Sequence, residues 1–314
     1  MKFEVHRPHA DRTAYAVVSP EVPVDADVLD AALAEHGAVL LERRCDDVDS
    51  FQQTTETVST AFSTYLGAGG GFTFGPMART SVADLPTVLT TTGPDQTQPI
   101  PLHGEMHYHP NPPEHIWFWC TVPPVRGGAT TIGDGVLAAE RLHPDALGWL
   151  ESNRIAYHRC LADGDWQRTF GDIPRAELLT GLESSGLEAS FTSDNTLETR
   201  CVRSALTTRG RATCFIANVL PAVLGEWLFE RGQYTDGRDR PAMIVRAEHG
   251  GRVPAEVVRA ITSACNDVTV PIAWGKGDVM LLDNHRVMHG RLGSPDPNRS
   301  IAVRLGSSLM PRQA

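Results

Sequence analysis

Long basic runs are missing from this chain of 314 residues, and acidic side chains outnumber lysine and arginine by 38 to 28. The formal net charge is −10 and the pI is about 5.6. Nucleic-acid-binding domains carry a basic patch or stripe, so no nucleic-acid partner is expected. An anionic ligand would have to be met by a few local arginines.

The chain also lacks any uninterrupted apolar stretch long enough to span a bilayer. Its first residues, MKFEVHRPHADRTAYAVV, do not contain the continuous apolar region of a secretory signal. None of the six cysteines belongs to a CxxC pair, which is typical of reduced, mostly buried thiols and argues against a disulfide framework or a zinc knuckle. We therefore expect a cytoplasmic protein with no membrane partner.

No internal repeat, low-complexity block or Pro/Ser-rich linker divides the sequence, so one domain over residues 1–314 is expected. Residues 27–36 predict a helix that is ended by Gly37 and followed by an apolar strand. A second helix is predicted over residues 48–66.

From about residue 100, short segments rich in β-branched and aromatic residues alternate with turn residues, a pattern typical of a β-sandwich or barrel. These segments are IPLHGEMHYH, HIWFWCTV, GGATTIG, TCFIANVL, DVTVPIAW, GDVMLLDN and SIAVRLGSSL. Helical inserts are predicted at 133–151, 173–186 and 254–267. The fold expected is mainly β with helical inserts, a double-stranded β-helix (jelly roll) with flanking α-helices.

The stretch PLHGEMHYHP concentrates three histidines and a glutamate. Interpreted as a strand, it would point His103, Glu105, His107 and His109 to one face, because side chains alternate with period two. A histidine and a carboxylate two residues apart can fill neighbouring positions on one cation. The alternative for His107 and His109 is that they line a pocket or bond backbone carbonyls.

Such a pair needs a third ligand, and LLDNHRVMHGRLG offers His289, with His285 as another possibility. Two histidines and one carboxylate form the facial triad of non-haem Fe(II) oxygenases. On its own the HxE motif is a weak signal.

The surroundings of these residues resemble a known family. RTSVADLPTVLTTTG leads into IPLHGEMHY, PPEHIWFWCTVPPVRGGATTIGDG follows, and WGKGDVMLLDNHRVMHGRLG precedes NRSIAVR. In this order, HxE, GGxT, GDxxLxDN, HGR and a later arginine are similar to the TauD/TfdA group of Fe(II)/2-oxoglutarate-dependent oxygenases, the clavaminate-synthase-like jelly rolls. The resemblance covers about residues 79–305 and is greatest to members with glutamate in the metal motif, many of which act in natural-product pathways.

The resemblance implies that His103, Glu105 and His289 hold Fe(II), with 2-oxoglutarate and O2 as co-substrates. It also implies that Thr130 and Arg299 bind the distal carboxylate of 2-oxoglutarate. The family often has paired arginines here, whereas Arg299 and Arg304 are five residues apart and would face opposite sides of a regular strand. Arg304 is therefore the alternate for this role, or a contact for the substrate.

Family members that halogenate carry a small residue at the position of Glu105, which leaves a coordination site for chloride. A carboxylate leaves no such vacancy and favours hydroxylation. A desaturase or cyclase on the same scaffold is an alternative. A non-catalytic, cupin-like metal-binding protein is another, although such a protein needs no 2-oxoglutarate site.

The substrate implied is an amino acid, free or tethered to a carrier protein, or a similar small polar metabolite. Arg79 is a candidate partner for a substrate carboxylate, with a structural ion pair as the alternative. His107, Trp117, Trp166 and Asn218 are candidate pocket walls, each also compatible with a place in the core.

Two segments are expected to close over the substrate. Residues 67–78, GAGGGFTFGPMA, contain five glycines, and residues 163–200 join two stretches that resemble the family's lid, an insertion at about 160–210. Glycine-rich backbone is costly to order, so we expect both segments to be loose without substrate and to exclude water when closed.

Overall fold

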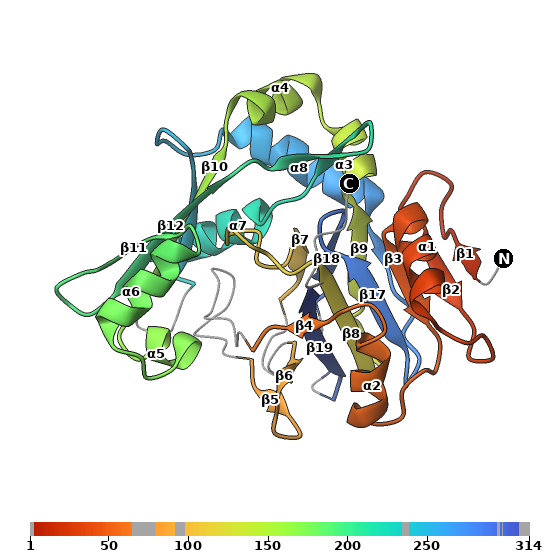
Figure 1. Cartoon of the computed structure of the whole chain (residues 1–314). Coiled ribbons are helices and arrows are strands. Elements are labelled where there is room, and N and C mark those ends of the chain that lie inside the picture. Colours follow the sequence, from red (N-terminus) through yellow and green to blue (C-terminus); the bar gives the residue numbers. More distant parts are fainter. Residues whose placement is uncertain are drawn as a thin grey trace.

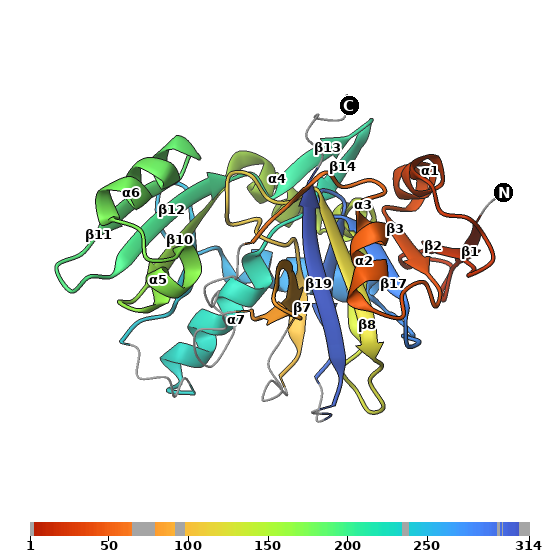
Figure 2. The same ribbon diagram turned by 60° about the horizontal axis from the view of Figure 1, so that its bottom comes forward.

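Two β-sheets face each other at the centre of the molecule and form the jelly roll (Figures 1 and 2). The structure is a computed structural model that describes residues 3–64, 79–91, 98–233, 239–293, 296 and 298–307. The larger sheet, the major sheet, has the order β1-β2-β3-β17-β8-β19-β6-β5, and β4 also pairs with β19. The smaller sheet, the minor sheet, has the order β16-β9-β18-β7.

Most strands are short and antiparallel, as the alternation of apolar segments and turn residues predicts. The strands of the major sheet are β1 (Glu4–His6), β2 (Tyr15–Val18), β3 (Ala38–Leu41), β4 (Ala61–Phe62), β5 (Ser81–Val82), β6 (Leu85–Thr90), β8 (His115–Val122), β17 (Val279–Asp283) and β19 (Ser300–Ser307). Those of the minor sheet are β7 (Ile100–His103), β9 (Thr130–Asp134), β16 (Val270–Pro271) and β18 (Val287–Arg291).

Alternation along β8 divides the core into two layers. Phe118 belongs to the large cluster between the sheets, whereas its neighbours Trp117 and Trp119 belong to a second cluster on the outer face of the major sheet. That outer cluster contains the buried sides of α1 (Ala26–His36) and α2 (Val48–Thr55). The face of the major sheet that carries Phe118 therefore faces the minor sheet, and we call it the inner face.

The remaining helices near the jelly roll cover the minor sheet. The helix α7 packs on β7 and α8 on β9, while α3 and α4 pack on α8 (Figure 1). Their bounds are α3 (Gly135–Arg141), α4 (Pro144–Ser152), α7 (Val219–Glu230) and α8 (Ala255–Val268). Both faces of the minor sheet are thus buried.

A separate sheet with the order β11-β12-β10-β15, here called the lid sheet, stands beside the jelly roll (Figure 1, left). Its elements, with the two helices that pack on it and the hairpin that follows β12, are α5 (Asp165–Phe170), α6 (Arg175–Ser184), β10 (Ile155–Leu161), β11 (Glu188–Phe191), β12 (Leu197–Arg203), β13 (Leu206–Arg209), β14 (Ala212–Phe215) and β15 (Met243–Ala247). Trp166, Leu178, Leu182 and Leu197 form a small core of its own. Residues 163–200 thus contain regular elements, among them α6, which confirms the helix predicted over 173–186; the other segment expected to close over the substrate, residues 67–78, lies outside the described residues.

Three predicted elements have different bounds in the structure. The helix expected over 48–66 ends at Thr55, where β-branched residues with low helix propensity follow. The helix expected over 133–151 is divided, because the residue before Pro144 is disfavoured in helical geometry and His143 is extended there. The strand expected in TCFIANVL covers only its first three residues, and α7 begins at Val219.

Among the described residues, no helix is both long enough and apolar enough to cross a membrane.

Candidate metal centre and co-substrate site

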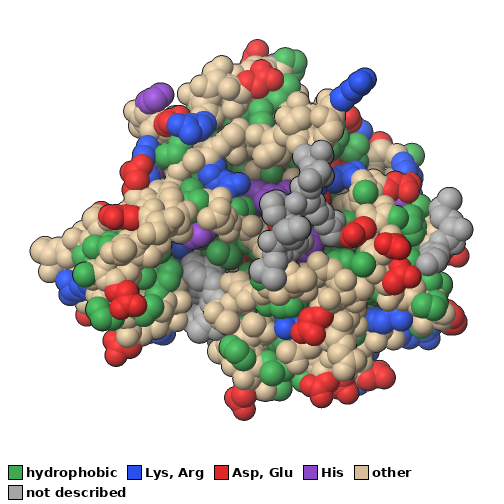
Figure 3. All heavy atoms as spheres, in the orientation of Figure 1, with side chains coloured by type: hydrophobic (Ala, Val, Ile, Leu, Met, Phe, Trp, Pro, Cys, Tyr) green, Lys and Arg blue, Asp and Glu red, His purple; other side chains and the backbone are tan. Residues whose placement is uncertain are grey.

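The structure brings together the three side chains predicted to bind metal. One ligand atom from each of His103, Glu105 and His289 lies within 4.8 Å of the others, and in the described part of the chain this is the one such group of three. His103 ends β7 and His289 lies in β18, where the two are paired directly across the antiparallel ladder. Figure 3 shows histidine side chains grouped near the centre of the face drawn in Figure 1.

Close approach of β7 and β18 at this point requires a glycine. A Cβ on Gly290 would lie 2.5 Å from the carbonyl oxygen of Ile100, well inside van der Waals contact. The backbone of β7 occupies the space that a side chain at position 290 would need, so only glycine fits there.

Protonation states at the cluster suit metal binding. His103 Nδ1 lies 2.9 Å from the Pro101 carbonyl, which leaves Nε2 to coordinate. Burial, together with the nearby His289, lowers the pKa of His103 to about 4, so the ring is neutral at pH 7. Burial opposes ionisation of Glu105, but the Arg79 guanidinium and the nearby His289 and His103 together outweigh it and hold the pKa of that carboxyl well below its usual range.

Glu105 reaches the cluster from a turn and not from a strand, which corrects the expectation that His103, Glu105, His107 and His109 alternate on one face. The strand β7 stops at His103, and the residues after it fold into a turn in which Met106 has φ +57°. We call residues 104–111 the ligand turn. In a regular strand, the backbone N–H and C=O of Glu105 would form hydrogen bonds with a neighbouring strand. Here one side chain forms hydrogen bonds with both groups.

That side chain is Asn284, which the sequence interpretation did not single out. Its amide accepts from Glu105 N (2.8 Å) and donates to Glu105 O (2.9 Å) and Pro113 O (2.8 Å), and the residue is fully buried. The only hint in the sequence was the quoted GDxxLxDN motif, whose asparagine carried no assigned role. Asn284 therefore fixes the backbone of Glu105, the carboxylate of the candidate metal cluster.

The expected co-substrate residues also meet. Arg299 donates to the Thr130 hydroxyl at 3.2 Å, and Trp274 Nε1 donates to the same oxygen at 3.0 Å. A hydroxyl has two acceptor positions and one proton, so these two contacts leave the Thr130 proton to be donated elsewhere. Trp274 is a residue that sequence reasoning missed, although it stands in the quoted WGKGD segment.

The charge around Thr130 favours an anion. Burial and the neighbouring Arg291, which pairs in register with Thr130, lower the pKa of Arg299 to about 10. The pKa of Arg291 is lowered by burial as well. A carboxylate placed here would receive a charged donor and a directed hydroxyl, and would relieve the repulsion between two buried guanidinium groups.

Arg304 and Trp117 lie elsewhere. Both point to the outer face of the major sheet, where Arg304 contacts Glu56 and Thr55 at the end of α2 and stacks 3.5 Å from the Phe62 ring. Trp117 is fully buried there and donates to Ser59. The structure therefore does not place Arg304 beside Thr130 or Trp117 in a pocket wall, because odd-numbered residues of β8 and their partners in β19 face away from the metal cluster.

The other histidines are kept apart from the metal cluster. His107 is buried and its Nε2 is 2.9 Å from the Asn284 carbonyl, in line with the backbone-bonding alternative. His109 Nδ1 accepts from Asn111 N, and the His285 ring lies 5.8 Å from that of His107. None of the three joins the group of close ligand atoms.

The remaining substrate candidates have different surroundings. Arg79 forms an ion pair with Glu105 at 2.9 Å, so it lies at the metal cluster. Asn218 donates to the Gly104 carbonyl at 3.3 Å and supports the ligand turn. Trp166 is packed against Phe191 in the core of the lid sheet, 5.1 Å between ring centroids, and is not a pocket wall.

The residues present fit Fe(II). Their donor set is two imidazole nitrogens and a carboxylate oxygen on one side of the cluster, the combination typical of non-haem Fe(II) enzymes. His289 Nε2 lies 3.5 Å from Glu105 Oε2, whereas its Nδ1 is buried without a hydrogen-bond partner among the described residues, so Nε2 is the nitrogen that faces the cluster.

Comparison with known proteins gives relatives over most of the chain. The chain is 27% identical over 293 residues to clavaminate synthase-like protein At3g21360 of Arabidopsis thaliana, covering 87% of this chain and 83% of that protein. It is 25% identical over 276 residues to dapdiamide synthesis protein DdaC of Enterobacter agglomerans, covering 84% and 80%.

Among solved structures, the fold is similar to that of PvcB from Pseudomonas aeruginosa, an Fe, α-ketoglutarate-dependent oxygenase, with a TM-score of 0.56 and 14% identity. That match covers 98% of this chain and 92% of PvcB, and at this identity it establishes the fold alone.

The profile of the taurine catabolism dioxygenase TauD, TfdA family matches residues 10–305. This range contains every residue of the metal cluster and of the Thr130 site. The chain belongs to the TauD/TfdA family and is a dioxygenase that depends on Fe(II) and 2-oxoglutarate.

Proposed function

We propose that this enzyme hydroxylates an unactivated C–H bond of an amino acid, free or carrier-tethered, or of a similar small polar metabolite. In this proposal His103, Glu105 and His289 hold Fe(II), while Thr130 and Arg299 hold the distal carboxylate of 2-oxoglutarate. The observation that carries it is the meeting of these two groups around β18, which supplies His289 at one point and pairs with Thr130 two residues later.

When bound, iron supplies O2 activation: 2-oxoglutarate is oxidised to succinate and CO2, and one oxygen atom enters the substrate as a hydroxyl group. The protein's part is positioning and exclusion of water. Glu105 supports hydroxylation over halogenation, because its carboxylate takes a coordination position that a halide would need.

Arg79 supports a carboxylate-bearing substrate. One guanidinium nitrogen is 2.9 Å from Glu105 Oε2, and a guanidinium has five N–H donors in a planar fork. Arg79 is therefore a charged, multi-donor group beside the metal cluster, of the type that binds carboxylates. An amino acid bound in this way would present its side chain to the iron.

A biosynthetic role is supported by two of the similar proteins. By their descriptions, DdaC is a dapdiamide synthesis protein and PvcB comes from an isonitrile synthetic pathway. We also propose that the enzyme acts in the cytoplasm, in keeping with its six cysteines, all of which are free thiols.

The test is a screen of amino acids, alone and as carrier-protein thioesters, for substrate-stimulated succinate release. We expect at least one amino acid to stimulate release and to gain one oxygen atom by mass spectrometry. His289→Ala is the control for adventitious iron chemistry. If no amino acid in either form stimulates release while other small polar metabolites do, the amino-acid assignment is wrong.

Product analysis separates the alternative reaction on the same scaffold. Loss of two hydrogens without gain of oxygen would identify a desaturase or cyclase. A non-catalytic metal-binding protein would give no visible charge-transfer band when Fe(II) and 2-oxoglutarate are added without oxygen; we expect the band, because Thr130 and Arg299 provide a site for the co-substrate.

A further inference from the structure

The ligand turn, residues 104–111, is held from two sides by different parts of the molecule. On the jelly-roll side, Asn284 binds both backbone groups of Glu105, and His107 Nε2 bonds the Asn284 carbonyl. Gly104 N donates to the Ala217 carbonyl at 3.0 Å. These contacts place the first half of the turn, which carries the metal-binding carboxylate.

The second half of the turn is held by the lid sheet. Arg203, at the end of β12, donates through one guanidinium nitrogen to the carbonyls of His109 (2.6 Å) and Pro110 (2.7 Å). The Arg159 guanidinium of β10 lies 4.6 Å from the centre of the Tyr108 ring. Both arginines are on one face of the lid sheet, the face directed at the turn, since Ile155 of β10 pairs with Arg203 and Arg159 pairs with Thr199.

Contacts of this kind resist displacement. A charged donor to a carbonyl gives a shorter and stronger hydrogen bond than a neutral one, and Arg203 makes two of them. The two carbonyls are four and five residues from Glu105, within a turn that contains a left-handed residue, Met106. A shift of β12 would therefore displace the second half of the ligand turn, the same short segment that carries Glu105.

We propose that Arg203 is a positioning residue that couples the placement of the lid sheet to metal binding by Glu105. The proposal rests on the proposed metal site and adds a residue that contacts neither metal nor substrate. Coupling between two sites is reciprocal: if the docked lid sheet favours the metal-binding geometry of Glu105, then metal binding must favour the docked lid sheet.

The test uses Mn(II), which does not turn over, with the full-length protein. We expect Arg203→Met to weaken Mn(II) binding by about tenfold or more, the range seen when residues that orient metal ligands are changed. Arg203→Lys, which keeps a charged donor, should recover part of the affinity. Hydrogen exchange adds a readout that needs no variant: Mn(II) should slow exchange across β12 in the parent protein, and this effect should be absent in Arg203→Met.

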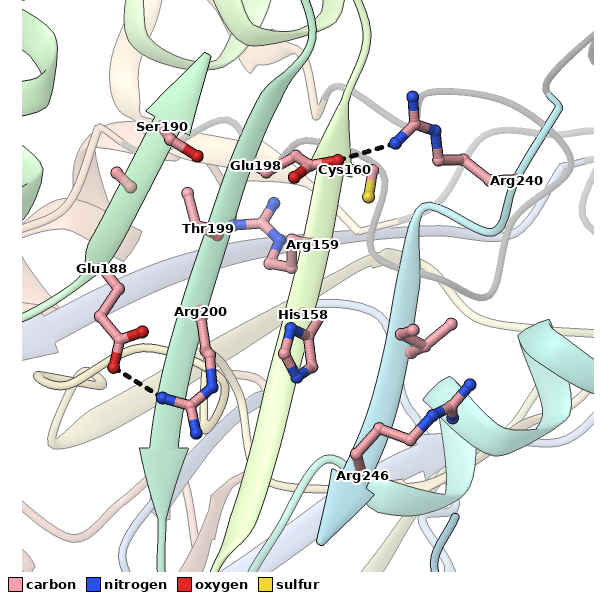
Figure 4. Close-up of a pocket in the computed structure, with 12 residues that line it drawn as sticks. His158, Arg159, Cys160, Glu188, Ser190, Glu198, Thr199, Arg200, Arg240 and Arg246 are labelled. Carbon is pink, nitrogen blue, oxygen red and sulfur yellow. Dashed lines mark hydrogen bonds and ion pairs between the residues drawn. The ribbon is translucent and has the colours of Figure 1, made fainter. Parts of the chain in front are cut away.

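Arg200→Met is the matched control. Arg200 lies on the same strand but on the outer face of the lid sheet, where it pairs with Glu188 at the edge of a hollow of about 610 Å³ (Figure 4). It should keep the parent's Mn(II) affinity and its metal-dependent protection of β12. A loss of affinity in Arg200→Met equal to that in Arg203→Met would show a general effect of weakening the lid sheet and overturn the proposal.

Unchanged Mn(II) affinity in folded Arg203→Met, or no metal-dependent protection of β12 in the parent, would also overturn it. If Arg203→Met does not fold, the proposal is tested by the Mn(II) affinity of Arg203→Lys and by the metal-dependent exchange of β12 in the parent protein. His289→Ala separates this inference from the metal site itself. Retained Mn(II) binding in His289→Ala refutes the site, whereas loss there with parent-like binding in Arg203→Met refutes only the coupling.

Discussion

Two buried nitrogens at the site, His289 Nδ1 and Arg299 Nε, have no hydrogen-bond partner among the described residues. Leaving a buried polar group unsatisfied costs about 1–3 kcal/mol. Elsewhere in the described chain most buried polar groups are paired, as for Asn284, which uses its whole amide. These two nitrogens lie beside the metal cluster and the Thr130 site, where a bound ligand would change their surroundings, although other buried polar atoms without a partner, such as His36 Nε2, lie outside the site.

Replacing His289 by alanine should remove metal binding and leave the fold intact. The imidazole is a ligand in the proposed metal site. The loss of its packing is opposed by relief of an unsatisfied buried nitrogen, so the free energy of unfolding should change by no more than about 1–2 kcal/mol. Calorimetric titration with Mn(II) and a circular-dichroism melt measure the two effects. His285→Ala should bind Mn(II) like the parent; an His289→Ala protein that does so too would contradict the assignment.

Replacing Arg299 should affect 2-oxoglutarate binding, whereas replacing Arg304 should affect stability. Arg299→Ala should raise the apparent KM for 2-oxoglutarate by about 10- to 150-fold, because it removes a charge-assisted contact of about 1.5–3 kcal/mol. Arg304→Ala should instead lower the free energy of unfolding, since it removes the contacts to Thr55, Glu56 and Phe62. Steady-state kinetics and denaturant titration of both variants give the comparison, and the opposite pattern would mean that the two roles are reversed.

Trp274→Phe should weaken 2-oxoglutarate binding through Thr130. Without the indole donor, the Thr130 hydroxyl can rotate and its proton no longer has a fixed direction. We therefore expect the KM for 2-oxoglutarate to rise about threefold to tenfold, which corresponds to one hydrogen bond of about 0.5–1.5 kcal/mol. A double-mutant cycle with Thr130→Val checks the mechanism. If Trp274→Phe has its full effect in the Thr130→Val background, the tryptophan acts by another route.

At the scale of elements, the lid sheet combines a core of its own with an attachment to the main one. Trp166 of α5, Leu178 of α6 and Leu197 of β12 pack together in the separate core. In contrast, Ile155 and Tyr157 of β10 belong to the cluster inside the jelly roll. The sheet is therefore expected to move as a folded unit, with α5 and α6 at its outer end the part most easily released.

Trp166→Ala should loosen that outer end selectively. Truncating a buried tryptophan costs about 3–5 kcal/mol, and here the loss includes the bond from Nε1 to the Asn195 carbonyl and the packing on Phe191. Limited proteolysis should then cut within residues 163–200 while β8, β17 and β19 stay protected. Trp227→Ala, an exposed tryptophan at 44%, is the control and should leave the pattern unchanged. Equal cleavage of the major sheet in Trp166→Ala would show that the two cores are not separable.

The whole molecule joins its sheets through one continuous apolar cluster that includes residues of β8, β10, β15, β18 and β19. Such continuity favours a single cooperative unfolding transition, and with it the expectation of one domain over residues 1–314. Ligands that bind only the native state then stabilise the whole chain by mass action.

Mn(II) and 2-oxoglutarate together should raise the Tm more than Mn(II) alone. At a free concentration of 100 times Kd, one ligand adds about 2.7 kcal/mol to the free energy of unfolding. In Arg299→Ala the response to Mn(II) should remain and the further response to 2-oxoglutarate should be reduced, whereas His289→Ala should respond to neither. Differential scanning calorimetry measures both shifts, and a 2-oxoglutarate response in Arg299→Ala equal to the parent's would refute its role.

Much of this protein was determined by local sequence. The strand segments β8, β9, β17 and β19, the helices α1, α6 and α8, and the end of α1 at Gly37, which has φ +68°, follow from periodicity and from residues with special backbone preferences. The identity of the metal-cluster residues also followed from the sequence, because a facial triad needs particular ligand types and the family's motifs occur in order.

The tertiary structure decided what depends on contacts between distant residues. Asn284 and Glu105 are 179 positions apart, and Trp274 and Thr130 are 144 apart, so no local pattern could reveal that one side chain ends a strand to form the ligand turn and another directs a hydroxyl proton. The insertion at about 160–210 was expected from the sequence, but its four-stranded sheet was not, because the order β11-β12-β10-β15 depends on pairing between strands far apart in the chain. Periodicity follows from the geometry of a single chain segment, whereas these contacts exist only once the segments are brought together.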